Sequence, residues 1–152
     1  MAFGRSEDGG YHWKAGASTF PSIHGGQREI MIRLGALTDP IMMCSFANDP
    51  MQVPCKGGGS YAVTGLYCAV SLDDHGAAWD HRRLITTDTT VEGKWVEGFD
   101  NRKFKMSFNS SEPDGYMDAT VVDGTIHLIT STNHYEFSTA WLLDLPSPPN
   151  PE

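Results

Sequence analysis

The sequence is poor in positive charge, with 11 Lys and Arg against 19 Asp and Glu and a formal net charge of −8 at pH 7. Its basic clusters, at residues 81–83 and 102–103, are short. A surface that follows a phosphate backbone needs clustered Lys and Arg side chains. The composition therefore argues against nucleic acid as a partner, but it leaves open an anionic sugar bound by one buried arginine pocket.

Long apolar runs are also missing. No stretch is long enough to span a bilayer, and residues 1–5 lack the charged-then-apolar order of a signal peptide. We therefore expect no membrane as a partner. We also expect a chain that is either cytoplasmic or a fragment of a secreted protein.

Cysteine is scarce and is not spaced as it is in metal sites. Cys44, Cys55 and Cys68 are odd in number and show no C-x-x-C spacing. The sequence therefore predicts no metal site and no cofactor. The count is compatible with one disulfide and one free thiol.

Helical periodicity is missing too, since no stretch keeps apolar residues at helical spacing for three turns. Runs rich in β-branched and aromatic residues recur instead, and Asp123-Gly124 is a hairpin signal. We expect one all-β domain over residues 1–145, loops at 48–60 and 88–111, and a flexible Pro-rich tail at 146–152. The expected strands are residues 1–6, 29–34, 41–47, 65–72, 83–87, 116–122, 125–132 and 135–143.

One internal repeat is present. Residues 6–13 (SEDGGYHW) match residues 72–79 (LDDHGAAW), each between two expected strands. The aligned pairs are Asp8 with Asp74, Gly10 with Gly76, and Trp13 with Trp79. In such a turn the carboxylate accepts backbone N–H bonds, the glycine takes a positive φ and the indole packs over the turn. We expect both carboxylates to bond their own turns and both tryptophans to be buried.

The repeat resembles the Asp-box (BNR) motif, S-x-D-x-G-x-T-W, of sialidases and related glycoside hydrolases. The resemblance implies sialidase-like β-propeller blades of antiparallel strands. Residues 1–20 would supply two strands of one blade, 29–87 a whole blade and 116–143 three strands of another. Since this is little more than two blades, we expect a fragment of a larger propeller or a homo-oligomer that completes the ring by self-association.

The resemblance also implies a carbohydrate partner, glycoside hydrolase ancestry and a terminal or acidic sugar as substrate. A polysaccharide lyase, a lectin-like module without catalysis and a non-catalytic fragment are the alternatives. The residues assigned on this basis are His134 and Tyr135 as catalytic groups, with Arg28, His24 and Trp95 as substrate-binding groups. Glu136 follows Tyr135 directly, so the two side chains face opposite sides of a regular strand.

Overall fold

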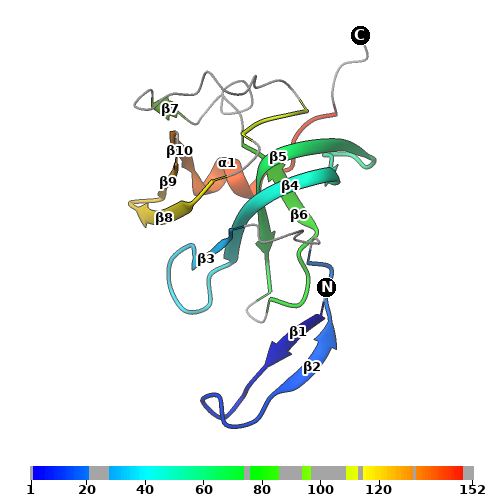
Figure 1. The fold of residues 1–152 in the computed structure, drawn as a ribbon, viewed down its shortest axis with the longest axis vertical. Helices are drawn as coiled ribbons and strands as arrows, with labels where there is room; N and C mark the ends of the chain where they lie inside the picture. The colour runs from blue at the N-terminus through cyan, green and yellow to red at the C-terminus, as the bar shows by residue number, and fades with distance from the viewer. Residues whose placement is uncertain are drawn as a thin grey trace.

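The computed structural model describes residues 2–20, 28–73, 76–85, 94–96, 109–112, 115–131 and 133–148. Within these residues the structure is all-β, as expected, apart from one short helix (Figure 1). Its elements are β1 (Ala2–Arg5), β2 (Lys14–Ala17), β3 (Ile30–Arg33), β4 (Ile41–Pro54), β5 (Ser60–Ser71), β6 (His81–Leu84), β7 (Lys94–Val96), β8 (Met117–Val122), β9 (Thr125–Thr130), β10 (His134–Ser138) and α1 (Thr139–Leu143).

The strands form three antiparallel sheets, with the orders β1-β2, β3-β4-β5-β6 and β7-β10-β9-β8. In Figure 1 the long, curved β4 and β5 occupy the centre, the β8–β10 sheet lies to one side, and the β1–β2 hairpin projects from the N-terminal end. No closed sheet forms among the described residues. No helix in this part of the chain has the length and apolar character needed to cross a membrane.

The loop expected over residues 48–60 is wrong, because β4 and β5 continue through most of it. Their register shifts from Ala47↔Gly65 to Met51↔Val63, so three residues of β4 oppose one of β5. This bulge accommodates Pro50 without ending the sheet. The turn that joins the strands shrinks to residues 55–59, where three successive glycines take φ of 85°, 103° and 80°.

The hairpin predicted at Asp123-Gly124 is confirmed. Asp123 and Gly124 have φ of 49° and 77°, the pair of positive values that a two-residue type I′ turn requires.

The strand expected over 135–143 is wrong in its second half, because α1 begins at Thr139. Ser138 caps this helix by accepting the Trp141 N–H at 3.0 Å. A five-residue helix is too short to show the periodicity on which the expectation of no helix depended.

The main core lies between the two four-stranded sheets and includes side chains of α1. It comprises Leu34, Met42, Cys44, Phe46, Leu66, Cys68, Val70, Ile85, Ile126, Leu128, Tyr135, Phe137, Trp141 and Leu142. A second apolar cluster covers the other face of β4 and β5 and includes Trp79. The sequence therefore buries both faces of its central strands, which explains their nearly continuous apolar runs.

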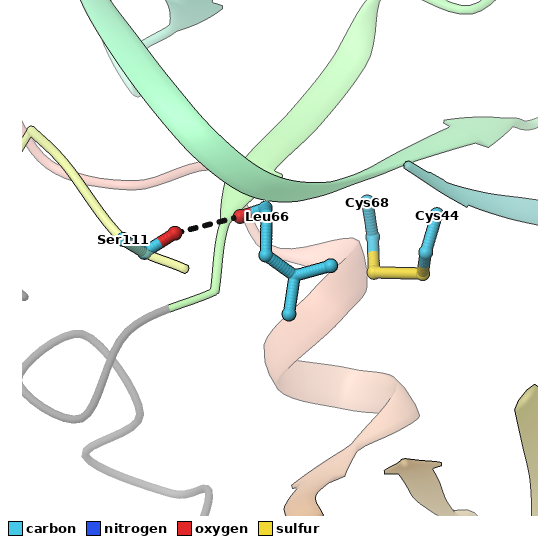
Figure 2. The surroundings of a disulfide bond; sticks show 4 residues. All are labelled: Cys44, Leu66, Cys68 and Ser111. Carbon is cyan, nitrogen blue, oxygen red and sulfur yellow. Dashed lines mark hydrogen bonds between the residues drawn. A yellow bond between two sulfur atoms is a disulfide. The ribbon is translucent and has the colours of Figure 1, made fainter. Parts of the chain in front are cut away.

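A disulfide joins Cys44 and Cys68, which are directly opposite partners on β4 and β5, while Cys55 is a buried free thiol. Figure 2 shows the disulfide and the Leu66 side chain on the same face of the sheet. Beside them the Ser111 hydroxyl donates to the Leu66 carbonyl at 3.2 Å. Gly65 permits this approach, since a Cβ there would lie 2.6 Å from the Ser111 carbonyl oxygen and φ is 103°.

Candidate functional site

The first repeat forms a tight turn between β1 and β2. Asp8 Oδ1 accepts the His12 N–H at 2.9 Å, and the Trp13 Nε1–H donates to the Gly10 carbonyl at 2.9 Å. Hydrogen bonds to the Asp8 carboxylate, first from the His12 N–H and then from the His12 and Ser6 side chains, lower the pKa of Asp8 to about 2. The expectation that Asp8 bonds its own turn is confirmed. The expected burial of Trp13 is wrong, because this two-stranded sheet leaves the indole 66% exposed.

The second repeat forms the turn between β5 and β6. Here the Trp79 Nε1–H donates to the Gly76 carbonyl at 2.6 Å, which reproduces the tryptophan–glycine bond of the first turn. Asp73 accepts the N–H groups four and five residues later, at 3.2 and 3.0 Å. Asp74, the expected acceptor, lies outside the described residues. Trp79 is 2% exposed and packs edge-on to Phe20 at 5.0 Å between ring centroids, so its expected burial is confirmed.

Arg28, the expected substrate-binding arginine, directly precedes Glu29 and β3. Its guanidinium donates from Nη2 to the Tyr116 hydroxyl at 3.0 Å and lies 4.6 Å from the centroid of that ring. Both residues are exposed. Tyr116 precedes β8, so the pair joins the beginnings of two strands that belong to different sheets.

The far ends of the same two strands border a groove of about 420 Å³. It is lined by Ile32, Arg33, Leu34, Gly35, Ala119, Thr120, Val121, Asp123 and Gly124. Arg33 donates from Nη1 to the Asp39 carbonyl at 2.9 Å, which fixes one wall. Since β3 and β8 begin together and end together, they lie side by side and run in the same direction.

His134, an expected catalytic residue, lies on the outer face of β10 beside two other side chains of types that can bind a metal ion. His134 Nε2 is 3.3 Å from His127 Nδ1 and 3.9 Å from Glu136 Oε1. His127 Nδ1 is 3.5 Å from the same oxygen. We call these three residues the His–Glu cluster. Their side chains are 26–29% exposed, so water reaches them.

Tyr135, the other expected catalytic residue, points the opposite way, into the core. Its hydroxyl donates to Glu112 Oε2 at 2.9 Å, and the same oxygen accepts Thr130 Oγ1–H at 2.9 Å and Asn133 Nδ2–H at 3.1 Å. Both Tyr135 and Glu112 are 0% exposed. Burial, and then the adjacent carboxylate, raise the pKa of Tyr135 far above its ordinary value, so the phenol stays protonated and acts as a donor.

Two further expected residues are only partly accounted for. His24 lies outside the described residues. Trp95 is in β7, where its backbone is the register partner of Tyr135 on β10. Their assignment to substrate binding stays a prediction.

The comparisons with known proteins add no relative. A scan against protein-family models, a search of curated proteins and a search of solved structures each found no match.

Sequence reasoning missed His127 and Glu112 for different reasons. His127 follows from strand register. The two-residue turn at residues 123–124 pairs it with Thr120 on β8, and the pairing of β9 with β10 makes Glu136 its directly opposite partner on the other side. Glu112 carries no such signal, because it lies in the irregular segment 109–112, which only tertiary packing brings to Tyr135.

Proposed function

We propose that this chain is a carbohydrate-directed protein of sialidase-like, β-propeller ancestry, and that it binds a terminal or acidic sugar along β3 and β8. The arrangement of these two strands carries the proposal. β3 begins the antiparallel meander β3-β4-β5-β6, and β8 begins the meander β8-β9-β10. First strands that lie side by side and run in one direction are what neighbouring propeller blades require around their axis.

The paired turns support the same ancestry. Both Ser6–Trp13 and its counterpart before β6 join antiparallel neighbours, and in both the indole N–H bonds the carbonyl three residues earlier. These bonds stiffen the hairpins and involve no reacting group. Their role in the proposal is therefore structural.

The sugar-binding chemistry would come from the residues that border β3 and β8. The Arg28 guanidinium can donate two parallel bonds to a sugar carboxylate. The neighbouring Tyr116 is 67% exposed and offers an aromatic surface to a sugar ring. Arg33 and Asp123 add polar groups at the other end.

Binding without turnover is favoured over hydrolysis by one observation. Tyr135 is buried and protonated, and His134 lies on the other face of β10, so these two do not form one acid–base site here. Neither residue lines the groove. Lectin-like binding is therefore the form of the proposal that the geometry supports best.

A glycan array, together with a panel of fluorogenic glycosides, tests the proposal. We expect binding to glycans that carry a carboxylate, no hydrolysis, and at least about tenfold weaker binding for Arg28→Ala, the loss expected from charge-assisted hydrogen bonds. Arg5→Ala removes an exposed arginine of β1 and serves as the matched control. Unchanged binding by Arg28→Ala, or no glycan bound at all, would contradict the proposal.

Self-association is part of the same proposal. Among the described residues, one four-stranded sheet ends at β3 and β6 and the other at β7 and β8, and the edge of a sheet is the place where a further strand can be added. We expect light scattering at low micromolar concentration to give a mass of two or more chains. A clean single-chain mass with no concentration dependence would refute ring closure by copies of this chain.

A further inference from the structure

We propose that the His–Glu cluster is a binding site for one divalent transition-metal ion of the zinc class. The cluster contains His127, His134 and Glu136 and lies on the outer face of the β9–β10 pair. It shares no residue with the groove between β3 and β8, so this inference does not depend on the proposed sugar site.

Strand register brings the three side chains together. His127 and Glu136 are directly opposite partners on β9 and β10, and His134 precedes Glu136 by two residues on the same face. The turn between the strands is held by Thr130, whose N–H donates to the Asn133 carbonyl at 2.8 Å and whose hydroxyl accepts the Asn133 N–H at 3.0 Å. The strand register and this turn therefore place the three residues on one face of the hairpin before any ion arrives.

The separations between the donor atoms fit one small ion. A tetrahedral zinc ion with ligand bonds of about 2.0–2.1 Å keeps its donors about 3.3–3.4 Å apart. The three donor atoms of the cluster lie 3.3, 3.5 and 3.9 Å from one another. Two separations already match, and the third needs a contraction of about 0.5 Å, within reach of a partly exposed side chain.

The donor set selects the class of metal. Two imidazole nitrogens and one carboxylate oxygen suit zinc and its first-row neighbours, whereas calcium and magnesium prefer oxygen ligands throughout. Three protein ligands leave a coordination position for water or another ligand. The 26–29% exposure of the side chains leaves that position accessible from solvent.

The same geometry also fits a hydrogen-bonded network without a metal ion, and the experiment must distinguish this network from a metal site. Without a metal, one imidazole can donate to the other across 3.3 Å, and Glu136 can pair with either ring when that ring is protonated. Such a network needs no ion and would give no saturable, stoichiometric metal uptake.

Isothermal titration of the chelator-treated, oxidised chain with zinc chloride tests the site. We expect one zinc ion per chain, and at least about tenfold weaker binding for His127→Ala, His134→Ala and Glu136→Gln. His12→Ala removes an exposed imidazole outside the cluster and serves as the matched control, with binding unchanged. Magnesium chloride, titrated in the same way, should give no binding at this site.

Two measurements on the unaltered chain cover the case in which a variant fails to fold. Cobalt chloride should give the visible absorption of a tetrahedral site, and zinc should shift the imidazole nitrogen resonances of His127 and His134 but not those of His12. Absence of stoichiometric zinc uptake, retention of binding in His127→Ala, or zinc-induced shifts outside the cluster would each overturn the proposal.

Discussion

Truncating the two repeat tryptophans separately should show that similar turns have unequal energetic roles. Trp79→Ala removes an indole that is 2% exposed, packs on Phe20 and lies against the β4–β5 core. Trp13→Ala removes an indole that makes the same bond to a glycine carbonyl but is 66% exposed. The pair therefore separates tertiary burial from the local bond.

The expected magnitudes follow from burial. A buried Trp→Ala change costs about 3–5 kcal/mol of unfolding free energy, because it loses contacts and leaves a cavity. For Trp13, about a third of an aromatic surface of roughly 150–250 Å² is removed from water, which at about 25 cal/mol per Å² gives an upper limit of about 1–2 kcal/mol. Solvent also fills the space that Trp13 leaves.

Urea unfolding followed by far-ultraviolet circular dichroism measures both variants, since tryptophan fluorescence would itself change. We expect a clear fall in midpoint for Trp79→Ala and a small one for Trp13→Ala, with similar slopes. Equal losses would show that the local turn, and not the core contact, sets the stability. An unchanged midpoint for Trp79→Ala would contradict its packing role outright.

Three further predictions use the same unfolding assay. Reducing the Cys44–Cys68 disulfide, whose residues are 24 apart, should lower the unfolding free energy by about 3.5 kcal/mol, and a loss near zero would show that the β4–β5 pairing already restrains the unfolded chain. Tyr135→Phe removes one of the donors to buried Glu112 and should cost about 1–3 kcal/mol; a more stable variant would refute that role. Burial lowers the pKa of His81 below 6.5 in the folded state. The unfolding free energy should therefore fall as the pH drops below about 6.5, until the pH passes the folded-state pKa of His81. His81→Gln should abolish that dependence, and an equal dependence in the variant would assign it to other groups.

The fold could be predicted from the sequence wherever local chemistry decides it. The two-residue turn at Asp123-Gly124 was identified because few residue pairs accept two successive positive φ values. The predicted hairpin of residues 29–34 and 41–47 was also found, as β3 and the first half of β4. The continuation of β4 past Pro50 could not be predicted, since a proline within an apolar run normally ends a strand and only the bulge opposite β5 accommodates it.

The candidate sites divide in the same way. Alternation along β10 correctly separates Tyr135 from Glu136, since successive side chains of a strand face opposite sides. It does not reveal that Tyr135 meets Glu112, 23 residues earlier, because that contact depends on how an irregular segment packs.

The sequence by itself determined the β-strand character, the hairpin turns and the local bonds of the repeats, because these depend on residues within about ten positions of one another. Tertiary structure decided which repeat tryptophan is buried, which cysteines pair, and which carboxylate meets Tyr135. The physical reason is that burial and site assembly depend on which surfaces meet. Two segments with the same local pattern, such as residues 6–13 and 72–79, reach different environments once the sheets pack.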